Sequence, residues 1–227
     1  MTARICVSIL PKNNVEALSL IEKAEKAKAD LIEVRLDCLE ISRHLSDISA
    51  STKIPLIATN KLQSETGFFD GTDSERQQTI LKAAKNGFEY VDVDLLSPKH
   101  KELISQLKML GAKPIVSYHK FDGALNVSAM EKVLDEEIAS GASICKIVTT
   151  AKQVKDTLPA LSFVAFASSK AKLVCFCMGE HGKVSRLLSP VFGAFLTFAS
   201  LDEGDETAAG QMTIQEMRAA YGLLGIK

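Results

Sequence analysis

A chain of 227 residues, 46% of them hydrophobic, is long enough to bury one sizeable core in a single domain. Its formal net charge of −1 gives no electrostatic reason to expect nucleic acid or an anionic membrane as a partner. No apolar run approaches the ~20 residues of a membrane span, and the first residues lack a signal-peptide pattern. The five cysteines include no Cys-x-x-Cys pair, which favours free thiols in a reducing cytoplasm.

Strand-like and helix-like segments alternate along the whole chain. Short apolar runs predict strands, and longer stretches with apolar residues three or four positions apart predict helices. Gly87, Gly111 and Gly141 stand where three helices should end, as C-terminal caps often do. The predicted strands are 4–9, 31–36, 55–59, 90–95, 113–117, 143–148, 172–178 and 193–199. The predicted helices are 15–28, 41–48, 74–86, 98–110, 128–140, 151–166, 184–188 and 213–224.

Eight such units predict an α/β fold, a single-domain (β/α)8 TIM barrel that spans residues 1–227. An open doubly wound sheet is the alternative. In a barrel, functional side chains gather at the carboxyl ends of the strands and in the loops that follow them. The chain order of the strands therefore indicates which side chains should meet.

Lys146 is the most unusual residue because it interrupts the apolar strand 143–148. Lysine is rarely buried without a partner. Burial disfavours the ammonium form, so we expect a lowered pKa and a neutral amine that can form an imine with a carbonyl compound. The alternative is a structural lysine whose amine reaches solvent from the strand end.

Charged side chains share one face of two predicted strands. Glu33, Arg35 and Asp37 alternate with apolar residues, and Asp92 and Asp94 repeat this pattern. We expect these charged faces to point into the barrel, where the side chains must pair or bind a polar ligand. A purely structural ion-pair network is the alternative.

His119 ends the run 114–119, which extends the fifth predicted strand, and Lys146 lies on the sixth. Neighbouring strands run about 4.8 Å apart, so both side chains can face one substrate. A neutral imidazole beside an imine can remove a proton and return it to a leaving group. The histidines, cysteines and carboxylates lack the spacing of a zinc or iron site, so we expect neither a metal nor a cofactor.

Two segments near the C-terminus suit an anionic ligand and a lid. Ser185 and Arg186 follow a glycine turn near the predicted start of a short helix, where a helix N-terminus and an arginine favour a carboxylate. Residues 200–210, after the last strand, are rich in Asp, Glu, Gly and Ala. We expect this loop to overhang the barrel mouth as a lid that is mobile without ligand. A merely flexible polar loop is the alternative.

Together these residues resemble the type I 3-dehydroquinate dehydratases, which are metal-free Schiff-base dehydratases of the shikimate pathway built on a (β/α)8 barrel. The resemblance spans nearly the whole chain in the right order. It is carried by Glu33-x-Arg35-x-Asp37, Ser117-x-His119, Lys146, Gly182-x-x-Ser185-Arg186 and Thr207-Ala-Ala-Gly-Gln211.

The resemblance implies that 3-dehydroquinate is converted to 3-dehydroshikimate without a cofactor. Lys146 would form the imine with the C3 ketone. His119 would take the C2 proton and protonate the departing C1 hydroxyl, and Glu65 matches the glutamate that the family pairs with its histidine. The remaining residues would bind substrate: Arg186 its carboxylate, Glu33 and Arg35 its ring hydroxyls, and Thr207 and Gln211 the ligand under the closed lid.

Several residues depart from the family pattern, among them Lys61, Thr207 and Ala209. Lys61 stands where the family often has arginine, so it keeps the charge without the bidentate fork. Thr207 stands where serine is common and keeps the hydroxyl. Ala209 stands where proline is common, which would loosen the lid.

Two other functions fit a barrel with a strand lysine. A class I aldolase is the alternative among enzymes, but it usually needs a phosphate site, and no glycine-rich phosphate loop is evident near the last two strands. A catalytically silent barrel that binds a polar metabolite is the alternative outside enzymes. We expect a small-molecule substrate, no nucleic acid and no membrane, and the sequence is compatible with a homodimer.

Overall fold

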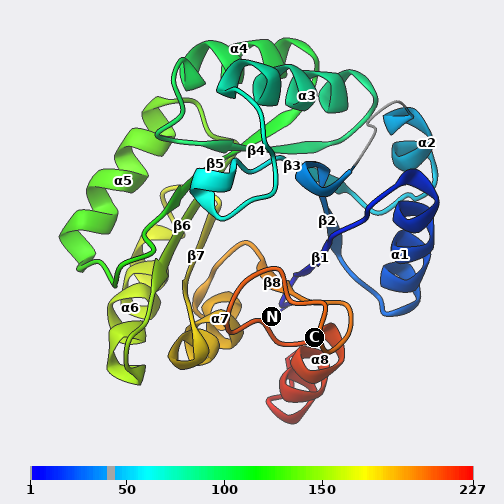
Figure 1. Ribbon diagram of the computed structural model, residues 1–227. Coiled ribbons are helices and arrows are strands. Elements are labelled where there is room, and N and C mark those ends of the chain that lie inside the picture. Colours follow the sequence, from blue (N-terminus) through cyan, green and yellow to red (C-terminus); the bar gives the residue numbers. More distant parts are fainter. Residues whose placement is uncertain (1, 40–43, 227) are drawn as a thin grey trace.

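The computed structural model describes residues 2–39 and 44–226, in which parallel strands alternate with helices that surround them (Figure 1). The strands are β1 Ile5–Ile9, β2 Leu31–Arg35, β3 Leu56–Thr59, β4 Tyr90–Asp94, β5 Lys113–His119, β6 Ile144–Thr150, β7 Leu173–Met178 and β8 Thr197–Ala199. The helices are α1 Asn14–Lys26, α2 Leu45–Ala50, α3 Asp73–Lys85, α4 His100–Met109, α5 Val127–Ala139, α6 Leu158–Ala167, α7 Lys183–Leu188 and α8 Ile214–Leu223.

The strands form one parallel sheet in the order β7-β6-β5-β4-β3-β2-β1-β8. Because β1 pairs with both β2 and β8, the sheet curls round, and its two ends meet at a seam between β7 and β8. The backbone amide of Phe195, just before β8, crosses the seam and donates to the Leu173 carbonyl at 2.7 Å. The predicted (β/α)8 barrel is confirmed, and the open doubly wound sheet is wrong.

Most predicted elements agree with the structure to within a few residues, and three need correction. The helix predicted over 41–48 begins only at Leu45, while residues 40–43 lie outside the described part of the chain. A 3-10 turn occupies Val154–Thr157, and α6 follows it because Pro159 is tolerated only in the first helical turn. The last strand is short because Gly193, with φ of +111°, ends a preceding 3-10 turn.

The expected glycine caps are confirmed. Gly87, Gly111 and Gly141 have φ of +94°, +82° and +90°, a backbone region that side chains with a Cβ rarely adopt. Each follows the end of α3, α4 or α5 and turns the chain into the next strand.

The barrel interior has an apolar layer below a polar one. The apolar layer lies toward the amino ends of the strands and contains Cys6, Leu31, Ile57, Tyr90, Ile115, Ile144 and Val174. Two positions later each strand points its next inward side chain into the barrel. These side chains are mostly polar and buried: Ser8, Glu33, Thr59, Asp92, Ser117 and Lys146. The site therefore rests on a hydrophobic floor.

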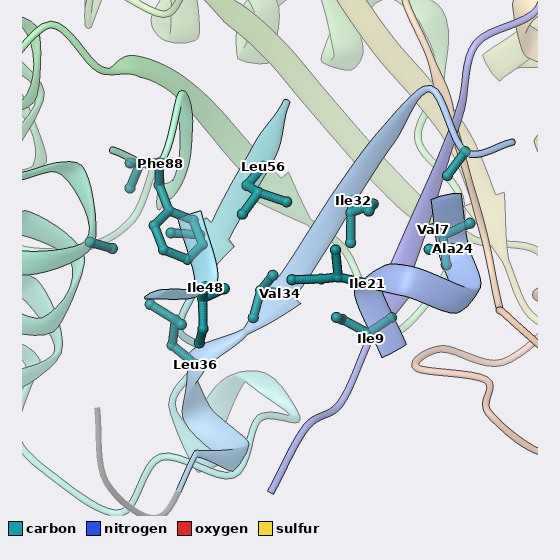
Figure 2. Packing of buried hydrophobic residues seen from close by; sticks show 14 of the residues in the cluster. Val7, Ile9, Ile21, Ala24, Ile32, Val34, Leu36, Ile48, Leu56 and Phe88 are labelled. Atoms are coloured by element: carbon teal, nitrogen blue, oxygen red, sulfur yellow. The ribbon is translucent and has the colours of Figure 1, made fainter. Parts of the chain in front are cut away.

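Outward-facing strand residues pack under the helices. Val7, Ile32 and Val34 meet Ile21 and Ala24 on the buried face of α1 (Figure 2). All five side chains are at most 1% exposed, so this layer is fully removed from water. It fixes the strand positions that carry the site.

The described ranges hold no helix with the length and apolarity that a membrane crossing requires. All five cysteines are free thiols, and four of them are buried. Cys175 and Cys177 lie on the same face of β7 without bridging, as expected from their spacing in an extended strand.

Replacing Ile21 by alanine should destabilise the fold by about 2–5 kcal/mol, because the change leaves a cavity in a fully buried layer. Leu18→Ala on the same helix is the matched control, since Leu18 is 37% exposed. Urea unfolding of both variants measures the difference. Equal losses for the two variants would contradict the packing described for α1.

Candidate active site

A cavity of about 330 Å³ opens at the carboxyl ends of the strands. All eight side chains predicted for the site line it, although they come from six different segments of the chain. They are Glu33, Arg35, Glu65, His119, Lys146, Arg186, Thr207 and Gln211. The strand ends therefore bring together the residues that the sequence pattern singled out.

Lys146 is buried inside the barrel, with 6% of its surface exposed. Its Nζ lies 3.1 Å from Asp92 Oδ2 and 3.9 Å from Glu33 Oε1. The same nitrogen lies 4.4 Å from the centroid of the Phe198 ring, within the range of a cation–π contact. The alternative of a lysine reaching solvent is wrong.

The pKa of Lys146 corrects a sequence-based expectation. Burial alone would lower this pKa, but the negative charges of Asp92 and Glu33 outweigh burial and raise it above the usual value of 10.5. Burial likewise works against the charge of Asp92, whose pKa is nevertheless lowered by Lys146 and Lys61. The free site therefore holds an ammonium ion, and the amine must lose a proton before it can attack a carbonyl.

His119 ends β5 beside Lys146 on β6, where the register pairs Ser117 with Lys146. Its ring stacks on Phe121 with centroids 6.0 Å apart. Burial, and then the positive charges of Lys61 and Lys146, lower the pKa of His119 well below its usual 6.5. A neutral imidazole, able to accept a proton, is therefore present at neutral pH.

Glu33 and Arg35 are held by partners on different elements. The Glu33 carboxylate accepts hydrogen bonds from Ser8 Oγ and from Thr59 Oγ1, the latter at 2.8 Å. The Asp37 carboxylate accepts hydrogen bonds from Arg35 Nε at 2.8 Å and from Arg35 Nη2 at 2.6 Å. The expectation that Asp37 shares a strand face with Glu33 is wrong, because Asp37 lies in the 3-10 turn after β2. From that turn its carboxylate fixes the Arg35 guanidinium.

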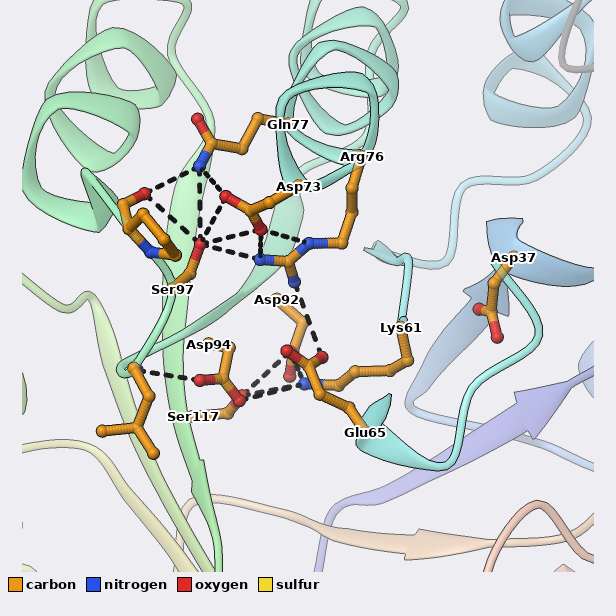
Figure 3. A network of polar contacts seen from close by, with 12 residues as sticks. Asp37, Lys61, Glu65, Asp73, Arg76, Gln77, Asp92, Asp94, Ser97 and Ser117 are labelled. Atoms are coloured by element: carbon orange, nitrogen blue, oxygen red, sulfur yellow. Dashed lines mark hydrogen bonds and ion pairs between the residues drawn. The ribbon is translucent and has the colours of Figure 1, made fainter. Parts of the chain in front are cut away.

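Glu65 occupies the loop after β3, and burial raises its pKa. Arg76 approaches it from α3, with Nη1 3.6 Å from Glu65 Oε2 (Figure 3). The guanidinium of Arg76 also holds Asp73 and donates to Ser97 Oγ at 2.8 Å. The pairing of Glu65 with His119 that the resemblance implied is not formed here, because the carboxylate faces Arg76.

Lys61 and Asp94 also line the cavity. Lys61 Nζ lies 2.7 Å from Asp92 Oδ1, and Asp94 accepts from the Leu96 amide at 2.8 Å (Figure 3). Asp92 does not line the cavity itself and sits behind the two lysines. The expectation that Asp92 and Asp94 point into the barrel is confirmed.

Arg186 is almost fully buried, at 1% exposure, yet its guanidinium faces the cavity. It stacks 4.3 Å from the Phe176 ring and makes one long bond of 3.4 Å to the Phe198 carbonyl, while Nε has no partner. Within the described ranges no carboxylate forms an ion pair with it. Burial lowers the pKa of Arg186 to about 10, so the group remains charged at neutral pH and lacks a counter-ion.

The expected anion site at a helix N-terminus needs correction. Helix α7 begins at Lys183, and Arg186 lies in its last turn. Ser185 Oγ is committed to the backbone, because it accepts from the Cys177 amide at 2.9 Å and donates to the Gly182 carbonyl at 2.8 Å. The guanidinium, rather than the helix terminus, brings a positive charge to the cavity.

The loop after β8 covers one side of the cavity. Thr207 and Gln211 are joined by two hydrogen bonds. The Thr207 backbone amide donates to Gln211 Oε1 at 2.7 Å, and Gln211 Nε2 donates to Thr207 Oγ1 at 3.0 Å. The Gly179 amide donates to the Ala209 carbonyl at 2.9 Å. Residues 207–211 are thus anchored, whereas 202–206 are exposed. The predicted mobility of the lid stays a prediction.

Several cavity residues were not identified from the sequence, among them Ser8, Thr59, Phe121 and Phe198. Ser8 and Thr59 are two inward positions that follow the same period-two rule as Glu33, so alternation along β1 and β3 could have found them. Phe198 lies on the short β8, where the pattern is too brief to show a face. Phe121 follows the end of β5, and its position depends on the loop.

The described residues contain no group of three or more His, Cys, Asp or Glu side chains that could hold a metal ion.

The family model for type I 3-dehydroquinase matches residues 5–227. A 3-dehydroquinate dehydratase of Desulfotalea psychrophila is 33% identical over 221 residues, which are 96% of this chain and 96% of that protein. The chain belongs to the type I 3-dehydroquinase family. A 3-dehydroquinate dehydratase of Methanococcus maripaludis is 32% identical over 222 residues, covering 97% of this chain and 99% of that protein.

Solved structures share the barrel of this family member. Type I 3-dehydroquinate dehydratase from Clostridium difficile, with covalently modified comenic acid, has a TM-score of 0.89 at 23% identity and covers 98% of this chain and 92% of its own. The 3-dehydroquinate dehydratase from Aquifex aeolicus has a TM-score of 0.81 at 25% identity, and the match covers 97% of this chain and 98% of that one. An aldolase shares the fold alone, with a TM-score of 0.60 at 14% identity. That match covers 97% of this chain and 96% of the aldolase.

Gly210→Ala should displace the anchored part of the lid, because a Cβ there would lie 2.1 Å from the Gly179 carbonyl oxygen. We expect faster amide hydrogen exchange over 207–211. Gly204→Ala is the matched control: Gly204 also has a positive φ, of +89°, but nothing lies within 4 Å of its Cβ position. Unchanged exchange in Gly210→Ala would show that residues 207–211 are not held by this contact.

Proposed function

We propose that this chain dehydrates 3-dehydroquinate to 3-dehydroshikimate, a step of the shikimate pathway, through an imine on Lys146. One observation carries the proposal: a single cavity holds the buried Lys146 amine, the neutral imidazole of His119 and the unpaired guanidinium of Arg186. Membership of the type I 3-dehydroquinase family supports the same reaction.

Lys146 supplies the nucleophile. After losing a proton, its amine attacks the C3 ketone, the carbonyl oxygen leaves as water, and a protonated imine remains. The positive nitrogen then stays beside Asp92, Glu33 and the Phe198 ring, which all favour a cation at this place. The imine withdraws electrons from C2 and makes its proton easier to remove.

His119 moves the proton in this scheme. Its neutral ring takes the proton from C2, and the electron pair expels the C1 hydroxyl, which leaves as water once His119 returns the proton. Hydrolysis of the imine releases the product and restores the Lys146 amine. No oxidant, reductant or cofactor is needed, because every atom is returned or leaves as water.

The remaining residues bind and orient the substrate in this proposal. Arg186 binds the substrate carboxylate, since its buried charge lacks a counter-ion. Glu33 and Arg35 bind ring hydroxyls, and Thr207 and Gln211 close the cavity from the lid. Glu65 is the remaining catalytic residue that we propose: it lines the same cavity, and its raised pKa suits a group that exchanges protons.

The two alternatives differ from the proposal in ways that can be measured. An aldolase would break a carbon–carbon bond, and the relatives named as 3-dehydroquinate dehydratases favour dehydration. A silent metabolite-binding barrel would bind substrate without forming product. We also propose a cytoplasmic location, supported by the five free thiols. Assembly as a homodimer stays a prediction.

Ultraviolet absorbance of the product tests the function directly. Purified protein mixed with 3-dehydroquinate should develop the absorbance of a conjugated enone, because dehydration places a double bond next to the carbonyl. Arg186→Ala should need a much higher substrate concentration, since it loses a charge-assisted contact. Ligand binding detected by calorimetry without any rise in absorbance would instead favour the silent barrel.

Borohydride added during turnover should reduce the imine and leave a covalent adduct on Lys146. The Lys146→Ala variant should take up none, because it lacks the amine. Mass spectrometry of proteolytic peptides locates the adduct. Lys152→Ala, an exposed position after β6, serves as the control and should be labelled on Lys146 like the unaltered protein. An adduct on another lysine would rule out the assignment.

His119→Ala should lower kcat by at least ~100-fold, the usual scale for a positioned general acid–base, while borohydride still traps the imine. Because burial and positive neighbours lower the pKa of His119 below 6.5, the unaltered enzyme should keep an unprotonated base at pH 6.5 and above. Steady-state rates across pH 5–8 check both points. A loss of only a few-fold would give His119 a structural role.

A further inference from the structure

Lys61 is a second buried lysine at the same carboxylate as Lys146. It directly follows Asn60 at the end of β3, and 7% of its surface is exposed. Its Nζ lies 2.7 Å from Asp92 Oδ1 and donates to Ser117 Oγ at 3.2 Å (Figure 3). Lys146 binds the other carboxylate oxygen, Oδ2, at 3.1 Å. One buried carboxylate is therefore shared by two ammonium groups.

Asp92 keeps its orientation without help from Lys146. Its Oδ1 accepts both from Lys61 and from Ser117 Oγ, the latter at 2.9 Å. Ser117 in turn accepts from Lys61, so these three side chains close a triangle of contacts. The contact to Lys146 can weaken while Oδ1 stays paired. A buried carboxylate without any partner would be strongly unfavourable.

The groups around Lys146 oppose one another. Negative charge on Asp92 and Glu33 favours the protonated form of Lys146. Positive charge on Lys61 opposes it in two ways, by direct repulsion and by neutralising part of the charge on Asp92. The titratable and charged groups that face Lys146 are Asp92 from β4, Glu33 from β2, Cys6 from β1, His119 from β5 and Lys61 after β3. Within this set, Lys61 binds the same carboxylate as Lys146, that of Asp92.

We propose that Lys61 is a positioning residue for the nucleophile: it shares Asp92 with Lys146, weakens the hold of that carboxylate on the Lys146 proton, and keeps Asp92 paired once the amine is uncharged. The inference rests on the proposed function, because only an amine that must become neutral needs this arrangement. Its test requires no substrate and therefore stands apart from the dehydratase assay.

Reductive methylation measures how readily Lys146 loses its proton, because formaldehyde with cyanoborohydride modifies only the neutral amine. The rate at Lys146 is followed by peptide mass spectrometry between pH 6 and pH 10 in the full chain. In Lys61→Met we expect modification about tenfold slower at neutral pH, with the profile moved to higher pH by about one unit. Lys61→Arg should restore the rate to within about threefold, because it returns the charge.

Two further variants keep the test decisive. Lys61→Gln removes the charge but keeps a hydrogen-bond donor, and it replaces Lys61→Met if that variant does not fold by circular dichroism. In an Asp92→Asn background the loss of Lys61 should slow methylation less, because the shared carboxylate is gone. Lys101→Met, at an exposed position on α4, is the matched control and should leave Lys146 unchanged.

An unchanged methylation profile in folded Lys61→Met would overturn the proposal, and so would a Lys61→Arg variant as slow as Lys61→Met. A raised KM for 3-dehydroquinate with an unaltered Lys146 profile would make Lys61 a substrate contact instead. Unaltered protein that forms no enone with 3-dehydroquinate would count against the proposed function and leave the methylation result standing.

Discussion

A carboxylate inside a protein stays ionised only when positive groups and hydrogen-bond donors replace the water it has lost. Asp92 meets this constraint with Lys146 on β6, Ser117 on β5 and Lys61 just after β3. The strand pairing must bring these side chains to one height in the barrel, and the apolar layer beneath excludes water from below. The charge of Lys146, the neutrality of His119 and the orientation of Lys61 all follow from this arrangement.

The fold and part of the site were predictable from the sequence because both depend on local periodicity, whereas Glu65, Thr207 and Gln211 were indicated only by the family resemblance. Alternation along β2 and β4 identified Glu33, Arg35, Asp92 and Asp94, and the order of eight strands and helices indicated the barrel. The pKa of Lys146 was not predictable in the same way. Its sign depends on the balance between burial and charges carried by other strands, and that balance requires distances.

Contacts that depend on helix and loop geometry were also beyond the sequence. Arg76 lies on α3, and only the packing of that helix brings its guanidinium to Glu65 (Figure 3). Asp37 continues the period-two pattern in the sequence, but the 3-10 turn after β2 moves it away from the strand face. The pattern found charged residues correctly, whereas the partner of each charge is a tertiary property.

The aromatic ring beside Lys146 has a consequence for the order of events in the proposed reaction. Phe198 attracts whichever species at Lys146 carries a positive charge, and an iminium nitrogen carries the same charge at the same place as the ammonium ion. The neutral carbinolamine between them loses this attraction. The ring therefore disfavours that tetrahedral adduct relative to the charged states on either side, so it favours the loss of water that restores a cation at this place.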